Sequence, residues 1–279
     1  MEEKDKYYKN LLVSMCLVVG EHCPRCSESR HYSLQDGRRR CPSCGYTYGL
    51  FTGRFINRVR IPLRSWLHIL NSFWDGQSVQ EAADILGIKY DTAYKAYTSV
   101  RLALLCSMLG LSDARLILDD TDGLVDFCPN LENEGEQAMC EGCRSYVFAL
   151  NGGHRNQAAL SLVQGVAARD VLTSPVGRKP WGTMVYTDRF RNWETLLFSC
   201  CRKGRELFLK EPSEEMFPVE RSGGFIDVAE PWMTKYRGIS PKSYPLYLAE
   251  MLFRYNFVFD DAISILANEL CQFSPSHCY

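Results

Sequence analysis

The residues best suited to chemistry stand near the start of the chain, as two pairs of cysteines. A proline and one other residue separate the thiols within each pair, and fourteen residues lie between the pairs. Two such pairs can supply four thiolates to one tetrahedral zinc ion. Four free thiols would leave this small segment without a core, whereas a bound metal would stabilise its fold. The spacing therefore predicts a zinc ribbon whose ligands are Cys23, Cys26, Cys41 and Cys44.

A run of basic residues lies between the two cysteine pairs. It comprises Arg38, Arg39 and Arg40, and we expect it to form a cationic edge on a hairpin of the ribbon. Zinc ribbons bind DNA, bind protein or stabilise a chain terminus. The arginines favour DNA, because phosphates attract positive charge. The alternative is a solvated basic face without a ligand.

Two helices are predicted downstream, over residues 78–97. Ser78 suits the N-cap of the first helix, and Glu81 completes a capping box. Gly87 suits the left-handed turn that ends this helix, and a second helix should begin near Asp91. This is the layout of a helix-turn-helix, whose second helix enters the major groove. The residues expected to face DNA are Lys89, Tyr90, Thr92, Lys95 and Tyr97.

The first of these helices is expected to carry one apolar stripe, formed by Ala82, Ile85 and Leu86. A plain helical hairpin without a ligand is the alternative to a DNA-binding motif. The position directly after a zinc ribbon favours DNA binding.

The composition is that of a folded protein, with 46% hydrophobic and 23% charged residues among 279. It excludes a largely disordered chain. Residues 1–115 carry 16 Lys and Arg against 11 Asp and Glu, a net charge of +5. Residues 116–279 carry 16 against 22, a net charge of −6, and eight of these acids fall within residues 116–141. The basic front half permits nucleic-acid binding.

The longest apolar run near the start covers residues 11–20. It is too short to span a bilayer, which needs about 20 residues, and nothing resembling a secretory signal surrounds it. We therefore expect a short buried helix there, no membrane association and a cytoplasmic protein. The thirteen cysteines are an odd number, which argues against a full disulfide framework.

Carboxylates follow predicted strands in the back half. Asp119 ends an apolar strand over residues 116–118, and Asp188 ends another over residues 183–187. A further strand is expected over residues 147–150, and helices over 246–259 and 262–270. Acids that meet in space can hold two Mg²⁺ ions for phosphodiester chemistry. Because acids at strand ends are common, this pattern alone does not single out a catalytic site.

The order of ribbon, helix-turn-helix and acidic α/β region resembles bacterial insertion-sequence transposases of the DDE type with an N-terminal zinc ribbon. The matching stretches span nearly the whole chain. They are residues 41–44 with 51–53, 61–66, 118–121, 185–188, 235–239, 246–248 and 253–256.

This resemblance implies an α/β fold with an RNase H-like mixed sheet and flanking helices, preceded by the zinc ribbon and the helix-turn-helix. The corresponding domains are an N-terminal helix and ribbon (1–54), a DNA-binding region (55–112) and a catalytic domain (113–279).

The family uses three acids and two Mg²⁺ or Mn²⁺ ions to cut and join DNA. Carried over by position, Asp119 is the first acid and Asp188 the second. The family's third acid, a Glu, would fall near Gly223, which has no side chain. Asp227, four residues on, would share a helix face with that position and is the first choice. The alternatives are Glu230, Glu220 or no third acid, and the family's His-containing stretch is missing.

Two functions remain open. The resemblance implies a transposase that binds terminal inverted repeats and target DNA as a homo-oligomer, associated with the bacterial nucleoid. Because the third acid is altered, the alternative is a catalytically inactive, transposase-derived DNA-binding or regulatory protein. A metal-stabilised protein-interaction module is a more distant alternative.

The segment after the first acid departs from the family, in which it is glycine-rich and basic. Its cysteines could form a second zinc site with His154, and free thiols are the alternative. The three cysteines are Cys128, Cys140 and Cys143.

Overall fold

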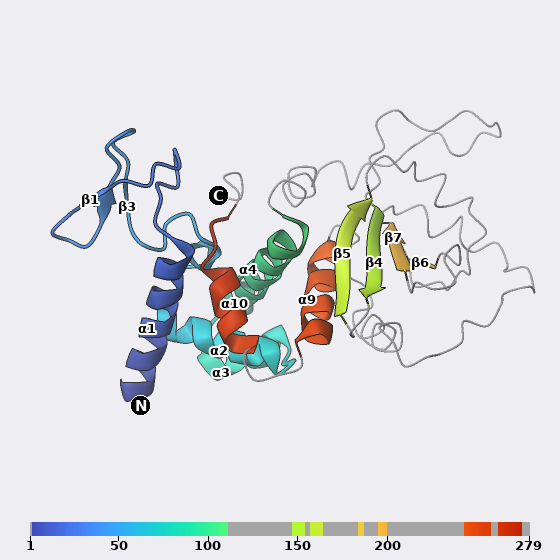
Figure 1. Cartoon of the computed structure of the whole chain (residues 1–279). Helices are drawn as coiled ribbons and strands as arrows, with labels where there is room; N and C mark the ends of the chain where they lie inside the picture. Colours follow the sequence, from blue (N-terminus) through green and yellow to red (C-terminus); the bar gives the residue numbers. More distant parts are fainter. Residues whose placement is uncertain are drawn as a thin grey trace, which may run out of the picture. The chain divides into compact units, whose positions relative to one another are not determined.

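The computed structural model describes residues 2–110, 147–153, 157–163, 184–186, 195–199, 243–257 and 262–274 (Figure 1). The chain forms two compact units. The first comprises residues 1–107 and 257–279, and the second comprises residues 108–256.

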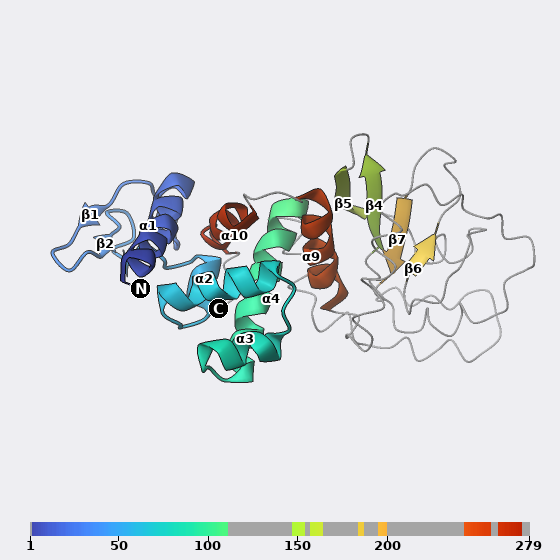
Figure 2. The same cartoon turned by 90° about the horizontal axis from the view of Figure 1, so that it is seen from below.

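The described elements of the first unit are helices, apart from those of the ribbon. Its helices are α1 (Glu2–Val19), the short 3-10 helix η1 (Phe55–Arg58), α2 (Leu63–Trp74), α3 (Val79–Leu86), α4 (Tyr90–Leu109) and α10 (Ala262–Leu270). Helix α10 packs against α1 and α2, and Figure 2 shows it beside α1. Helix α10, the last helix among the described residues and expected in the catalytic region from its place in the sequence, therefore packs against the N-terminal helix.

Helix α2 shows why these segments are helical. Pro62 stands at its N-cap, where its fixed φ suits the start of a helix. Apolar side chains then recur at intervals of three and four residues, so they share one buried face that includes Trp66, Leu70 and Phe73. After α10 the chain pairs with the residues before η1: Ser274 N donates to Gly53 O at 2.8 Å.

The ribbon is a small antiparallel sheet of β1 (Tyr32–Ser33), β2 (Arg39–Arg40) and β3 (Thr47–Tyr48), in that order. Arg39 pairs with Ser33 and Tyr48, whereas Arg40 pairs with Tyr32 and Thr47. Because neighbouring residues of a strand face opposite ways, Arg39 and Arg40 lie on opposite faces of this sheet.

The described part of the second unit contains four strands and one helix. The strands are β4 (Val147–Gly153), β5 (Gln157–Val163), β6 (Met184–Tyr186) and β7 (Thr195–Ser199), in the order β5-β4-β7-β6. Helix α9 (Tyr244–Asn256) packs against β5. The strands expected near 147–150 and 183–187 and the helix near 246–259 are thus present. The pairings among these four strands are antiparallel. The expected first strand lies outside the described residues, so the mixed RNase H-like sheet stays a prediction.

Among the described residues, no helix is both long and apolar enough to cross a membrane.

Candidate metal centre and nucleic-acid interface

Two turns of the same construction carry the four cysteines of the ribbon. In each turn, the first cysteine donates its N–H to the carbonyl oxygen five residues on and accepts from the N–H four residues on. These bonds measure 2.8 Å and 2.8 Å at Cys23, and 2.9 Å and 3.0 Å at Cys41. The residue four places after the first cysteine has a positive φ in both turns, 59° at Ser27 and 70° at Gly45. The repeated turn points both pairs of sulfurs toward one centre.

The four sulfurs lie within 4.8 Å of one another. The Sγ atoms of Cys23 and Cys44 are 3.6 Å apart, and those of Cys26 and Cys41 are 3.5 Å apart. A tetrahedral zinc with Zn–S bonds of about 2.3 Å separates its sulfurs by about 3.8 Å. The cluster could therefore hold a zinc ion, and no other group among the described residues offers three ligands so close together.

In two of the sulfur pairs, Cys23 with Cys44 and Cys26 with Cys41, either thiol can donate a hydrogen bond to the other. Burial opposes ionisation of Cys41, but hydrogen bonds from the Cys44 backbone and the Cys26 thiol lower its pKa to about 7. At Cys26 a backbone hydrogen bond at Glu28 favours the thiolate, yet contacts with the other sulfurs raise its pKa to about 12. A bound cation would allow all four thiols to ionise, as zinc ligation requires.

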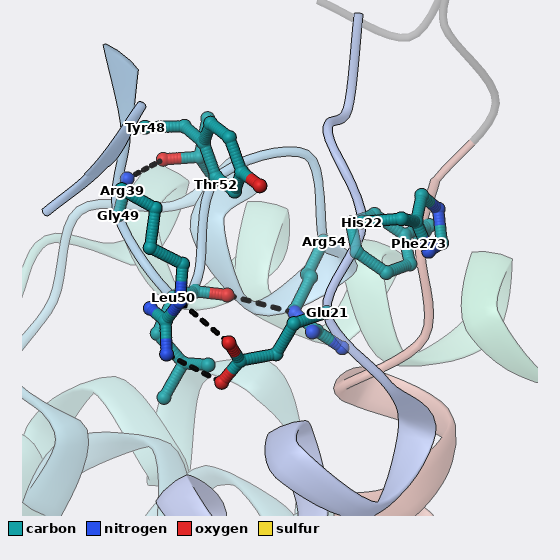
Figure 3. A pocket seen from close by; sticks show the side chains of 9 residues that line it. All are labelled: Glu21, His22, Arg39, Tyr48, Gly49, Leu50, Thr52, Arg54 and Phe273. Carbon is teal, nitrogen blue, oxygen red and sulfur yellow. Dashed lines mark hydrogen bonds and ion pairs between the residues drawn. The ribbon is translucent and has the colours of Figure 1, made fainter. Parts of the chain in front are cut away.

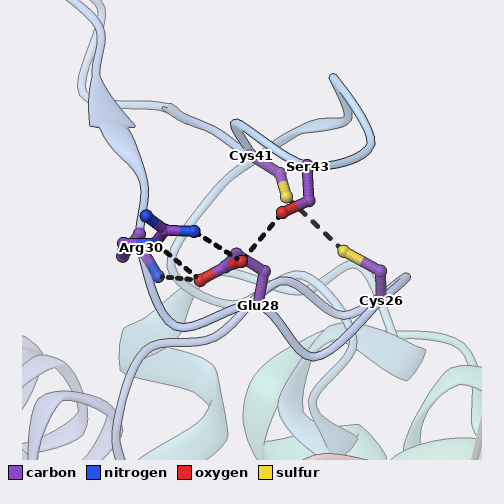
Figure 4. Close-up of polar contacts among 5 residues, drawn as sticks. All are labelled: Cys26, Glu28, Arg30, Cys41 and Ser43. Atoms are coloured by element: carbon purple, nitrogen blue, oxygen red, sulfur yellow. Dashed lines mark hydrogen bonds and ion pairs between the residues drawn. The ribbon is translucent and has the colours of Figure 1, made fainter.

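Glu28 ties the two cysteine turns together (Figure 4). Ser43, in the second turn, donates its hydroxyl to Glu28 Oε2 at 2.8 Å, and Arg30 donates to Oε1 at 3.1 Å. The hydrogen bond from the Arg30 side chain is the largest cause that lowers the pKa of Glu28, to about 2. This role was not predicted from the sequence, because nothing in the local pattern links Glu28 to a serine fifteen positions away.

The three arginines of the ribbon do not form one cationic edge. Arg38 pairs with Asp36 through Nε and Oδ2 at 2.7 Å. Arg39 points inward and donates two hydrogen bonds to the carboxylate of Glu21. One of them joins Nε to Oε2 at 2.6 Å. The side chain of Arg39 is only 16% exposed. Arg40 is exposed on the opposite face, so the expectation of a shared edge is corrected for Arg39.

A small pocket lies where the ribbon meets the helices of the first unit (Figure 3). Glu21 and Arg39 line it as an ion pair, and Arg54 lies beside them. Burial is the main cause that lowers the pKa of His22, whose ring packs against Phe273 with centroids 3.8 Å apart and the ring planes tilted by 35°. The carboxylate of Glu21 is already paired, and the lowered pKa of His22 favours a neutral imidazole. We therefore interpret this pocket as a structural contact between the ribbon and the helices.

Helices α3 and α4 and the turn between them have the local structure that the sequence predicts. Ser78 Oγ accepts from Glu81 N at 3.2 Å, and Glu81 Oε2 accepts from Ser78 N at 2.7 Å, which completes the capping box. Gly87 adopts φ 62° and ψ 32° at the end of α3. Ile88 N then donates to Ala83 O at 3.0 Å, which satisfies a carbonyl at the helix terminus.

The exposed side chains of α4 concentrate in its first two turns. Tyr90 and Lys95 are exposed, as is Lys89 just before the helix, while Thr92 is half-buried. Every residue from Ser99 to Cys106 is buried.

Two expectations for these helices were wrong. Tyr97 does not face outward: it is 2% exposed, and its hydroxyl donates to Gln77 O at 3.3 Å. Its ring packs edge-on against Phe73 with centroids 5.4 Å apart. Ile85 does not join the buried stripe, because Ala82 and Ala83 form the buried contact of α3 and leave Ile85 62% exposed.

The expected catalytic residues lie outside the described part of the chain. They include Asp119, Asp188, Asp227 and the alternatives Glu220 and Glu230. The same holds for the second zinc site proposed at Cys128, Cys140, Cys143 and His154.

No protein-family model, curated protein or solved structure matches this chain. The geometry of the four-cysteine cluster supports a possible zinc site.

Proposed function

We propose that this chain is a DNA-binding protein of the transposase type, whose helix-turn-helix α3–α4 docks in the major groove. The observation that carries the proposal is the exposed N-terminal end of α4. Lys89, Tyr90 and Lys95 lie there, whereas residues 99–106 of the same helix are buried. Recognition helices contact base edges with their N-terminal residues, and flanking lysines bind phosphates.

The ribbon has a second surface suited to DNA. Arg40 and Tyr32 are cross-strand neighbours on the exposed face of the sheet. An exposed cation beside an aromatic ring suits a phosphate and the adjacent sugar or base. Arg38 and Arg39 contribute less free charge than expected, because Asp36 and Glu21 pair with them.

We also propose that Cys23, Cys26, Cys41 and Cys44 bind one zinc ion with a structural role. Four protein ligands fill a tetrahedral coordination sphere and leave no position for substrate or water. The metal would hold together a ribbon whose own core consists of little more than Tyr48 against the cysteines.

The third part of the proposal is catalytic and rests on the family resemblance. Asp119 and Asp188 would be the first two metal-binding acids, and Asp227 the third, with Glu230 and Glu220 as alternatives. Mg²⁺ or Mn²⁺ held there would support cleavage of the terminal inverted repeats and strand transfer into target DNA. The protein would act as a homo-oligomer on DNA.

A catalytically inactive DNA-binding or regulatory protein is the second candidate function. The specific observation in its favour is Gly223, which stands where the family places its third acid. DNA binding by α4 is common to both functions, so it is the part to test first.

The test is a titration of a random-sequence DNA duplex with the full chain at several salt concentrations, followed by fluorescence anisotropy. Lys89→Gln and Lys95→Gln should each weaken binding and lower the salt slope by about 0.9 for each phosphate that the variant no longer binds. The matched control is Arg64→Gln, which removes an exposed cation from α2. If both lysine variants bind as the control does, α4 is not the DNA-binding helix.

A further inference from the structure

Exposed apolar side chains gather at the tip of the helix-turn-helix. Ile85 near the end of α3 is 62% exposed, Tyr90 at the start of α4 is 47% exposed, and Tyr94 one turn later is 40% exposed. Scattered exposed apolar residues are normal on a protein surface, whereas apolar side chains that gather in one region mark interaction sites. These three residues therefore suggest a surface with a binding partner.

The two tyrosines form an ordered pair. They stand four residues apart on one face of α4, and their rings stack with centroids 6.2 Å apart at an angle of 21°. Stacking holds each ring in a defined orientation, so little side-chain entropy remains to be lost on binding. The pair presents a rigid apolar surface at the helix terminus that would enter the groove.

The charges around this pair favour DNA over a protein partner. Lys89 precedes Tyr90 and Lys95 follows Tyr94, so an exposed cation flanks the pair at each end, against one exposed acid, Asp91, between the two tyrosines in the sequence. Lysines so placed can bind phosphates while the rings between them meet the base edges. A protein partner for the same lysines and tyrosines would need a surface that combines acidic and apolar side chains.

The major groove offers one apolar group to such rings, the 5-methyl group of thymine. Successive bases of one strand are about 3.4 Å apart, so the 6.2 Å between the ring centroids corresponds to about two base steps.

We infer that Tyr90 and Tyr94 read thymine methyl groups at two nearby positions of the DNA site. Ile85, five residues before Tyr90 in the sequence, is a further exposed apolar side chain of this region. The inference rests on the proposed binding of DNA by α4 and names the bases that this helix selects.

The experiment begins with the full chain and a pool of random-sequence duplexes, from which the tightest-binding duplex is selected. The same duplex is then synthesised with deoxyuridine in place of thymidine, which removes the methyl groups and leaves every hydrogen-bonding group in place. The wild type should bind the uracil duplex more weakly, by about fourfold for each methyl group it contacts. Tyr90→Ala and Tyr94→Ala should each reduce this discrimination, and the double variant should abolish it.

Two control variants separate a reading role from a structural one. Tyr94→Phe keeps the ring and should keep the discrimination. Tyr46→Ala removes an exposed tyrosine of the ribbon that lies outside both proposed DNA-binding surfaces, and should leave the discrimination unchanged. Because Tyr90 and Tyr94 are both exposed, their alanine variants should fold, which circular dichroism would verify.

The outcomes separate this inference from the proposed function. If the chain binds no duplex of the pool, the proposed DNA binding fails. If it binds the pool but enriches no duplex, DNA binding stands and thymine reading is overturned. If the wild type binds both forms of the selected duplex equally, DNA binding stands and thymine reading is overturned. If Tyr90→Ala and Tyr94→Ala leave DNA discrimination intact but convert an oligomer to a monomer in sedimentation, the surface serves self-association and the inference is likewise overturned.

Discussion

Arg54 donates a hydrogen bond from Nη1 to the carbonyl oxygen of Cys271 at 2.6 Å, across 217 positions of sequence. Its Nη2 donates to Gly20 O at 2.6 Å, and its Nε donates to Leu50 O at 2.8 Å. Gly20 and Cys271 directly follow α1 and α10, and neither helix has a basic residue in its last turn. One buried guanidinium therefore satisfies the C-terminal carbonyls of two helices and balances the negative ends of their dipoles.

Arg54→Met should destabilise the first unit by about 3–5 kcal/mol, because it leaves buried carbonyl oxygens without donors. The urea midpoint followed by circular dichroism would measure this loss. Arg54→Lys keeps the charge but cannot reach three carbonyls, so its midpoint should lie between those of the wild type and Arg54→Met. A loss below about 1 kcal/mol for Arg54→Met would show that water replaces the guanidinium.

Cys41→Ser should lower the zinc content of the purified chain by about one equivalent, because the cluster then lacks a fourth thiolate. Elemental analysis would measure the metal, and the melting temperature of the variant should fall. The control is Cys106→Ala, which removes a buried thiol of α4 outside the cluster and should leave the zinc content unchanged. Equal zinc in both variants would place the metal elsewhere in the chain.

Asp119→Asn, Asp188→Asn and Asp227→Asn should each reduce strand transfer by at least about a hundredfold, since each removes a carboxylate that the proposed mechanism requires. DNA binding should be retained. The assay would use DNA carrying the element's ends, with Mg²⁺ or Mn²⁺.

Asp120→Asn is the matched control for these variants, because it alters the acid next to Asp119. Glu230→Gln and Glu220→Gln would reveal a different third acid if Asp227→Asn remained active. Full activity in Asp188→Asn would refute the mechanism, and a wild type that binds but never cuts would favour the inactive regulator.

Glu269→Gln should stabilise the protein at neutral pH and above. Burial is the larger cause and raises the pKa of Glu269, although a hydrogen bond with Ser107 partly opposes it. A carboxyl group whose pKa is raised in the folded state costs stability once the pH exceeds its unfolded value. The melting temperature of Glu269→Gln should therefore exceed that of the wild type by about 1–3 °C at pH 7.

Melting curves at several pH values would check the sign of this effect. The difference should vanish in acid, where the wild-type carboxyl group is protonated in both states. Ser107→Ala should act in the opposite direction at pH 7, because the carboxylate of Glu269 then loses its hydrogen-bonding partner. A Glu269→Gln variant that is less stable at pH 7 would mean that the carboxylate is favourably bound there.

The sequence by itself determined those features whose contacts lie within a few residues. The spacing of Cys23 and Cys26 predicts a tight turn, and Ser78 with Glu81, three residues later, predicts the start of a helix. Gly87 marks the end of α3 because few other residues adopt its left-handed conformation. Such interactions depend on neighbours along the chain, so residue type and spacing suffice to predict them.

Only the tertiary structure decided which side of each element is buried. Arg39 turns inward because its partner Glu21 stands eighteen positions away, and adjacent residues of a strand cannot share a face. Tyr97 is buried because its ring packs against Phe73 of another helix. Arg54 gave no signal in the sequence, since its role requires the ends of α1 and α10 to meet. These choices depend on packing between distant segments, which local patterns of residues do not encode.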